Sequence, residues 1–390
     1  MSGRTPSKRR IAFVSTMAGS PWGGSEVLWH GTALRMLEAG YEVSASVFKW
    51  PETPRQIQEL ETAGCSLHFR QKKKNAIGRL LDRRFQQGAG IGITAADLKW
   101  LRGFSPELVV VSQGYPLDGL KWMNACRKLG IPYATVVQAA GELWWPFDPT
   151  ADEMISAYPN ATVACFVSRG NREVVERQIG MTLANGHVIC NPWNRSVDGA
   201  VAWPADDGHV DFACVGRLDP RAKGQDVIFR VLAMDKWRGR PVRLNLYGHG
   251  PCEQSLKRLA AMYGLENIRF HGRVDDIKKL WSENHALILP SRYEGLPLVI
   301  VEAMLCARPV ITTDIAGNAE YLVEGETGFV AAAPDPGLLD EAMERAWNAR
   351  GRWMEMGLRA RNDVLGILPA DPYAAFGNTV LRTLPGAKLL

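Results

Sequence analysis

The chain has 390 residues, of which 46% are hydrophobic and 22% charged, and a formal net charge of +5 at pH 7. This length favours two domains, and the composition is typical of an ordinary soluble globular protein. No apolar run is long enough to span a membrane, and residues 1–10 lack the apolar segment of a secretory signal, so we expect a cytoplasmic protein. The seven cysteines are scattered without metal-binding spacing and are interpreted as reduced core residues.

The first predicted elements are a buried strand over Arg10–Ser15 and a helix over Ser25–Glu38 that ends at Gly40. The loop between them contains the adjacent glycines Gly23 and Gly24, which let backbone approach a ligand closely. The helix that follows could hold a phosphate or a sugar at its N-terminus. This signal is weak by itself, because many α/β proteins turn on glycines and the loop is not the G-x-G-x-x-G of a dinucleotide fold.

Three further strands are predicted in the first half of the chain. They cover Val43–Val47, whose alternation predicts one less buried face, Glu107–Ser112 and Tyr133–Val137. Repeated alternation of strands and helices predicts a parallel sheet covered by helices on both faces. Ligands bind such sheets at the carboxyl ends of the strands, so the loops that follow strands are the first places to look for a site.

A basic segment, Arg70–Phe85, lies between the predicted strands Val43–Val47 and Glu107–Ser112. It has seven basic residues and one acidic residue, with apolar residues at roughly helical spacing. Such a face could rest on an anionic membrane or hold a polyanionic or lipid-diphosphate acceptor. The alternative is a solvated loop. Nucleic acid is a poor partner, because the rest of the chain shows no complementary basic stripe.

The loop after the strand Tyr133–Val137 combines aromatic rings with acids. Trp144 and Trp145 lie between Glu142 and Asp148, and flat rings beside hydroxyl acceptors are typical of a carbohydrate-binding surface. This pattern predicts an acceptor-binding role for the four residues. Core aromatics capped by loop acids are the alternative.

A strand over Val188–Asn191 is predicted to close the first domain, and Val210–Val215 opens a second α/β domain. The predicted domains are residues 1–195, 196–366 and a C-terminal segment, 367–390, that packs back on the first. After the strand Val210–Val215 come Arg217 and, near the start of a helix over Gln225–Leu232, Lys223. A guanidinium and an ammonium so placed would clamp a diphosphate from two sides.

The second domain continues with strands over Leu244–Tyr247 and Ile268–His271, and with an amphipathic helix over Pro334–Ala349. Pro251 follows the first of these strands and is predicted to start a helix. We expect the segment Tyr373–Leu384 to cross back to the first domain.

The stretch Leu287–Glu320 is the most informative part of the chain. A short strand ends at Pro290, and a helix starts after Pro297, so free N–H groups at Gly295 and Leu296 favour anionic ligands. Glu294 in the loop and Glu302 on the apolar helix frame this N-terminus. A buried carboxylate needs donors, and the two hydroxyls of a ribose would supply them to Glu302. Solvated surface glutamates are the alternative.

The string from Glu294 to Glu302, E-G-L-P-L-x-x-x-E, is followed by Arg308-Pro309-Val310, Gly317-Asn318-Ala319-Glu320 and Gly325-Glu326-Thr327-Gly328-Phe329-Val330. This pattern resembles the signature of the family-4 retaining glycosyltransferases, of glycosyltransferase group 1 type. The resemblance implies the α/β GT-B fold, in which two Rossmann-like domains with parallel sheets face each other across a cleft and a C-terminal helix crosses back to the first domain.

The resemblance also implies roles for residues of this chain. The expected catalytic residues are Arg217, Lys223 and Glu294. The expected donor-binding residues are Gly23, Gly24, Gln138, Gly216, Arg273, Val274, Gly295, Leu296, Pro297, Leu298 and Glu302. Gln138 stands where the family usually has a histidine, and because an amide does not titrate near neutral pH, a general-base role is not available there.

The implied activity is metal-independent transfer of a hexosyl group, with retention, from a UDP- or GDP-sugar to a glycan, lipid-linked or small-molecule acceptor. Such an enzyme would serve polysaccharide or glycoconjugate synthesis, in the cytoplasm or peripherally at the inner face of the membrane, and would need no cofactor. The alternatives are a nucleotide-sugar 2-epimerase of the same fold and a non-catalytic subunit that binds a sugar nucleotide.

Overall fold

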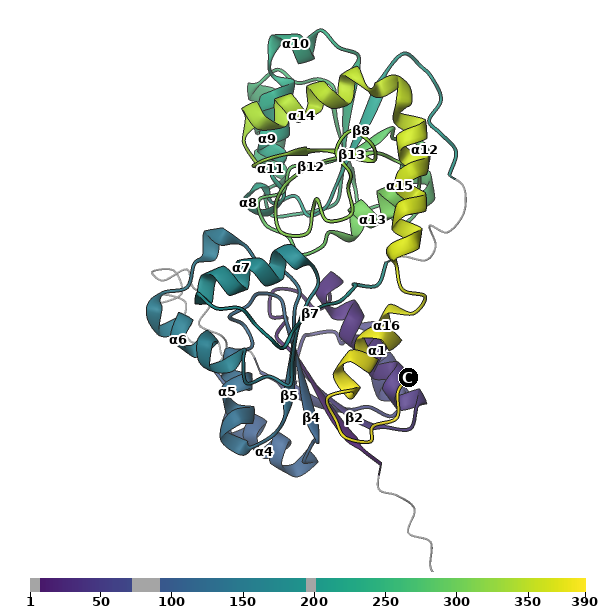
Figure 1. Ribbon diagram of the computed structural model, residues 1–390. Helices are drawn as coiled ribbons and strands as arrows, with labels where there is room; N and C mark the ends of the chain where they lie inside the picture. Colours follow the sequence, from purple (N-terminus) through teal and green to yellow (C-terminus); the bar gives the residue numbers. More distant parts are fainter. Residues whose placement is uncertain (1–7, 72–91, 194–200) are drawn as a thin grey trace, which may run out of the picture. The chain divides into compact units, whose positions relative to one another are not determined.

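The computed structural model describes residues 8–71, 92–193 and 201–390. The chain forms two compact units (Figure 1). Unit 1 comprises Met1–Pro192 together with Pro369–Leu390, and unit 2 comprises Trp193–Leu368. No helix among the described residues is long and apolar enough to cross a membrane.

Unit 1 is built on a parallel sheet with the strand order β3-β2-β1-β4-β5-β6-β7. The strand order runs outwards in both directions from β1 and β4, which is the arrangement of a doubly wound sheet. Its elements are β1 (Arg10–Ser15), α1 (Gly24–Glu38), β2 (Glu42–Phe48), α2 (Arg55–Thr62), β3 (Ser66–Arg70), α4 (Ala95–Phe104), β4 (Leu108–Gln113), α5 (Leu120–Leu129), β5 (Tyr133–Val137), the 3-10 helix η1 (Glu142–Trp144), α6 (Asp148–Ala157), β6 (Val163–Phe166), α7 (Arg169–Ile179), β7 (Gly186–Val188) and α16 (Pro372–Leu381).

Local sequence signals explain where several of these helices begin and end. Thr94 caps α4 through a reciprocal pair of hydrogen bonds with Asp97, which satisfies N–H groups at the helix start. After α1, Gly40 has a φ of +93°, and the N–H of Tyr41 bonds the carbonyl of Met36, which closes the helix as predicted.

One expectation for β2 is wrong. Its alternation predicted a face of lower burial, but every residue from Val43 to Phe48 is buried. Ser44 is accommodated because its hydroxyl donates to Ser66 O at 2.9 Å and accepts from Trp100 Nε1 at 3.0 Å. Alternating polar residues in a strand can therefore be buried rather than exposed, when their side chains have hydrogen-bond partners.

Unit 2 has a second parallel sheet, in the order β10-β9-β8-β11-β12-β13. Phe212 and Cys214 of β8 face one apolar cluster and Ala213 faces another, so both faces of the sheet are covered. Its elements are β8 (Val210–Val215), α8 (Pro220–Lys223), α9 (Gln225–Leu232), α10 (Asp235–Arg238), β9 (Val242–Tyr247), α11 (Glu253–Met262), β10 (Ile268–Gly272), α12 (Ile277–Ser282), β11 (Ala286–Leu289), α13 (Leu298–Leu305), β12 (Val310–Thr313), β13 (Gly328–Ala331), α14 (Pro336–Asn348), the 3-10 helix η3 (Arg350–Arg352) and α15 (Trp353–Ile367).

Two predicted elements lie elsewhere. The strand expected over Val188–Asn191 is β7, which ends at Val188, because the following residues lead out of the sheet towards Pro192. Pro251 does not start a helix, since α11 begins at Glu253 after the cap residue Cys252. Pro251 instead lies in the turn that Gly250 makes against Leu218, where a Cβ on Gly250 would lie 2.3 Å from the carbonyl oxygen of Leu218.

The C-terminal helix α16 packs on α1 of unit 1 (Figure 1). Gly31 makes this close approach possible, because a Cβ there would lie 2.3 Å from the ring of Tyr373. Thr32 Oγ1 donates to Tyr373 O at 3.2 Å, and Arg35 pairs with Asp371 at 3.1 Å. The chain therefore leaves unit 2 after α15 and finishes in unit 1.

Candidate active site

In unit 2 the loops at the carboxyl ends of the parallel strands pack closely against one another. Gly224 has a φ of +65°, and a Cβ there would lie 2.0 Å from the carbonyl oxygen of Pro290, just after β11. Gly248, with a φ of +131°, meets Gly216 O in the same way at 2.1 Å. Only glycine fits such backbone-to-backbone approaches. These glycines bring the loops after β8, β9 and β11 together at one edge of the sheet.

Lys223 and Glu294 form an ion pair at this edge. Glu294 is 8% exposed, and its Oε1 also accepts a hydrogen bond from Ser291 Oγ at 2.7 Å. The Lys223 side chain lies over Gly216, where a Cβ would stand 3.3 Å from the lysine Cε. Three predicted site residues from two separate loops are therefore neighbours.

Arg217 takes a different partner. Its side chain is exposed and pairs with Asp219 at 3.3 Å, and Asp219 also pairs with Arg221 at 3.1 Å. Asp219 is buried at the N-terminus of α8. Sequence reasoning missed this residue, although an Asp-Pro pair at the start of a helix is a recognisable signal.

The loop before α13 is held by the loop that follows β12. Gly317 N donates to Gly295 O at 2.8 Å, and Thr313 Oγ1 donates to Ser291 O at 2.7 Å. Leu296 and Pro297 are buried, Pro297 is the cap residue of α13, and Leu298 begins the helix. Two of the four sequence strings that carry the family resemblance, Glu294–Glu302 and Gly317–Glu320, are therefore held together by a backbone hydrogen bond.

Glu302 lies on α13 and is mostly buried. Among the described residues its carboxyl has no hydrogen bond or ion pair, and burial raises its pKa to about 7. A carboxyl group held this way is ready to accept hydrogen bonds from a ligand, because ionisation becomes favourable once donors are present.

Arg273 and Val274 follow β10. The Arg273 side chain is exposed and bonds Asp275 at 3.0 Å, while its backbone N–H donates to His249 Nε2 at 3.3 Å. Val274 packs against the apolar cluster that contains Trp281. His249 therefore links the loop after β9 to the loop after β10.

The predicted residues of unit 1 occupy two places. Gly23 caps α1 and Gly24 begins it. Gln138 follows β5, is buried, and accepts a hydrogen bond from Asn191 Nδ2 at 2.9 Å. Its Nε2 is buried without a partner among the described residues. That amide nitrogen is available to donate to an added oxygen.

The aromatic loop after β5 lies on the surface of unit 1. Trp144 is 38% exposed and Trp145 53%, and Asp148, the first residue of α6, is also exposed. Glu142 pairs with Arg177 at 2.7 Å. The rings are not packed in the core, so the alternative interpretation of core aromatics is wrong, while their acceptor role stays a prediction.

The basic segment Arg70–Phe85 lies largely outside the described residues. Arg70 itself ends β3 and is 7% exposed, so its side chain is not part of a surface face as the sequence suggested. Among the described residues, no group of three or more His, Cys, Asp or Glu side chains is arranged to hold a metal ion.

The fold of the chain and the sequence of unit 2 both match known proteins. The family model of the glycosyl transferases group 1 matches residues 209–349, within unit 2. Over 96% of this chain and 99% of the other, the fold matches Anabaena Alr3699/HepE, solved in complex with UDP, with a TM-score of 0.71 and 17% identity. Sucrose-phosphate synthase from Thermosynechococcus elongatus matches with the same TM-score, 19% identity, and 97% and 99% coverage. The predicted fold of two Rossmann-like domains of GT-B type is confirmed, and the resemblance to group 1 glycosyltransferases is confirmed over residues 209–349.

Curated relatives carry more specific names. The D-rhamnosyltransferase WbpZ of Pseudomonas aeruginosa is 31% identical over 33% of this chain and 35% of its own length. The GDP-mannose-dependent alpha-(1-6)-phosphatidylinositol monomannoside mannosyltransferase of Mycolicibacterium smegmatis is 27% identical over 57% of this chain and 62% of its own. The matched regions therefore span less than two thirds of either relative.

Proposed function

We propose that the chain transfers a hexosyl group from a UDP- or GDP-sugar to an acceptor, with retention of configuration and without a metal ion. The observation that carries this proposal is the cluster of Lys223, Glu294 and Gly216 beside the N-terminus of α13. It combines a cation with helix N–H groups for a diphosphate and carboxylates for sugar hydroxyls. The relatives support it, since HepE was solved with UDP and UDP-glucose and the mannosyltransferase is named for GDP-mannose.

In this mechanism the leaving nucleoside diphosphate is the group that needs stabilising. Lys223 and the exposed Arg217 neutralise the charge that develops on it, and we expect this electrostatic stabilisation to contribute most of the rate enhancement. Glu294 accepts hydrogen bonds from the sugar, and Glu302 accepts them from the ribose diol. Attack from the face of the leaving group requires no protein nucleophile.

The ion pair between Lys223 and Glu294 gives the ligand-free site its neutrality. When a donor enters, Lys223 contacts both the diphosphate and Glu294, so the carboxylate keeps a positive partner while it binds the sugar. Glu294 is buried, and its interactions act in a region of low dielectric where they are stronger than in water.

A panel of nucleotide-sugars tests this function. A donor present at 100 times its Kd should stabilise the fold by about 2.7 kcal/mol, which a thermal-shift assay detects as a raised melting temperature. The same mixtures are analysed for products. Slow release of nucleoside diphosphate supports transfer, formation of an epimer supports the 2-epimerase, and binding without either product supports a non-catalytic subunit.

A further inference from the structure

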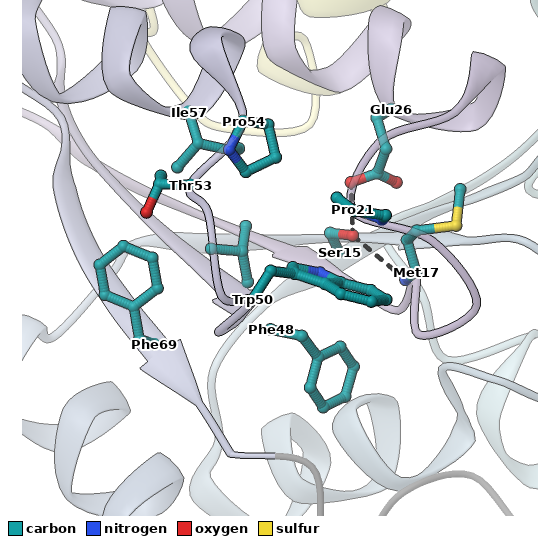
Figure 2. Close-up of a pocket in the computed structure, with 11 residues that line it drawn as sticks. Ser15, Met17, Pro21, Glu26, Phe48, Trp50, Thr53, Pro54, Ile57 and Phe69 are labelled. Carbon is teal, nitrogen blue, oxygen red and sulfur yellow. Dashed lines mark hydrogen bonds between the residues drawn. The ribbon is translucent and has the colours of Figure 1, made fainter.

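A recess lies at the carboxyl ends of the first three strands of unit 1. Ser15, Phe48 and Arg70 are the last residues of β1, β2 and β3. One pocket, shown in Figure 2, is lined by Ser15, Glu26, Trp50 and their neighbours. A second, of about 210 Å³, is lined by residues of β3 and the start of α4, and the two pockets share Phe48 and Phe69. Carboxyl ends of parallel strands are where such sheets bind ligands.

Arg70 is a buried cation in the wall of the second pocket. Its Nη2 donates to the carbonyls of Ser15 and Ser46, and its guanidinium carbon lies 4.0 Å from the centre of the Phe48 ring. Its Nε has no hydrogen-bond partner, and no carboxylate pairs with it among the described residues. Burial lowers its pKa to about 10. The guanidinium is therefore charged at neutral pH, and its Nε is unsatisfied among the described residues.

Arg308, in unit 2, shows how the same fold treats a purely structural arginine. It is 1% exposed, and all three of its guanidinium nitrogens donate to backbone carbonyls. The acceptors are the carbonyls of Ala202, Trp281, Asn284, Cys306 and Ala307. Among the described residues, Arg70 donates to carbonyls from one nitrogen where Arg308 donates from three, so carbonyl capping alone does not account for a charge at this position.

The nearest acids do not neutralise Arg70. Glu26 accepts a hydrogen bond from Ser15 Oγ at 2.6 Å, and burial raises its pKa to about 7, so it is only partly ionised at neutral pH. Asp97 is committed to His68 Nε2 at 2.8 Å and to the cap of α4. Burying a cation without a partner is costly, and an added oxyanion would relieve that cost.

We propose that the acceptor carries an oxyanion, a carboxylate or a phosphate, and that Arg70 binds this group in the pocket between β3 and α4. This inference rests on the proposed transfer reaction and names the chemical class of its acceptor. Arginine suits both oxyanions, since its planar donors match their geometry. The Phe48, Phe69 and Trp122 side chains lining the pocket supply apolar walls for the ring of an attached sugar.

Ala96 and Ala95 provide a matched pair of test positions. Both are exposed at the start of α4, but only Ala96 lines the pocket. Ala96→Trp should fill the pocket without altering the core, whereas Ala95→Trp adds the same ring outside it. Arg70→Gln removes the charge directly, and the tryptophan pair keeps the test valid if that variant fails to fold.

Binding to the full chain is measured by calorimetry at low salt with inorganic phosphate, glucuronate, glucose 1-phosphate and glucose. We expect at least one anionic probe to bind tenfold or more tightly than glucose, and the ranking of phosphate against glucuronate identifies which oxyanion the site takes. Ala96→Trp and folded Arg70→Gln should each weaken this binding at least tenfold, while Ala95→Trp leaves it unchanged. Equal binding of glucose, or anion binding that survives Ala96→Trp, would overturn the proposal.

Nucleotide-sugar binding to the same variants separates this proposal from the function on which it rests. Nucleotide-sugar binding should be the same in the wild type and in Ala96→Trp. If the chain binds a nucleotide-sugar but no anionic probe, the proposal of an anionic acceptor is overturned and the proposed transfer reaction is not. Anion binding in a chain that binds no nucleotide-sugar overturns the transfer reaction, and the acceptor role of Arg70 with it.

Discussion

At the scale of single residues, the ion pair of Lys223 and Glu294 is the feature most open to a direct test. Lys223→Ala should raise the free energy of the transition state by about 2–4 kcal/mol, because the leaving diphosphate loses a preorganised cation. Turnover should therefore fall roughly 30- to 1,000-fold. The substitution also leaves the buried Glu294 without its ammonium partner, so a lower melting temperature is expected.

Lys257→Ala is the control for that variant. Lys257 pairs with Glu253 on the surface of α11, at 2.7 Å, and a surface ion pair of this kind contributes little to the free energy of unfolding. Turnover is measured as release of nucleoside diphosphate, well below both melting temperatures. Full turnover in Lys223→Ala would refute the diphosphate clamp.

Glu302 makes stability depend on pH. Its pKa rises from an ordinary value of 4.5 to about 7 through burial, so the folded state holds a proton that the unfolded state releases between these values. The stabilisation is present below about pH 4.5 and is lost as the pH rises through 7. The variant Glu302→Gln cannot ionise at this position. Its free energy of unfolding minus that of the wild type should therefore be larger at pH 8 than at pH 5, by on the order of 2–3 kcal/mol.

Urea unfolding at the two pH values measures this difference. Glu355→Gln serves as a control, because Glu355 is an exposed carboxyl on α15. The idea that Glu302 is buried and lacks a partner fails if both variants show the same dependence on pH.

At the scale of elements, glycines decide how closely the strand-end loops of unit 2 approach. Gly224→Ala should destabilise the protein by more than about 3 kcal/mol, because left-handed backbone strain adds to a clash with the carbonyl of Pro290. Gly325 also has a positive φ, of +73°, but nothing lies within 4 Å of its Cβ position. Gly325→Ala should therefore show the strain alone, about 1–2 kcal/mol.

Equilibrium unfolding of these two variants isolates the contribution of the clash. Similar losses in both would mean that the loop at Pro290 moves aside easily. A larger loss in Gly224→Ala, accompanied by weaker nucleotide-sugar binding, would show that the close approach of Gly224 to Pro290 positions Lys223.

At the scale of the whole molecule, the C-terminal helix ties the end of the chain to unit 1. Phe376 on α16 is 1% exposed, and Phe376→Ala should cost about 3–5 kcal/mol. Hydrogen exchange should become faster in α1 and its neighbouring strands, with little change in the strands of unit 2. Leu389→Ala, at a position that is 42% exposed, is the control.

A uniform increase in exchange across both sheets would contradict this expectation. It would mean that the two units unfold together and that α16 stabilises them jointly. If the faster hydrogen exchange is confined to unit 1, the two units unfold as separate cooperative blocks.

The sequence alone determined those features that depend on neighbouring residues. Apolar runs located β1, β5, β8 and α9 with the observed bounds, because periodicity and terminal signals are local. The string from Glu294 to Glu302 carried the resemblance to group 1 glycosyltransferases, since its spacing follows from one strand, loop and helix. The helix predicted to start at Pro251 begins instead at Glu253, because a proline is as compatible with a turn as with a helix start.

Only the tertiary structure could decide which distant groups meet. Arg70 belongs to a basic stretch in the sequence, but it is buried because β3 ends beside the carbonyls of β1 and β2. Ser291 and Asp219 became visible as partners of site residues only once their loops were in place. Burial and ionic partners are set by segments far apart in the chain, so a local pattern predicts which residues carry charge, while packing decides what that charge faces.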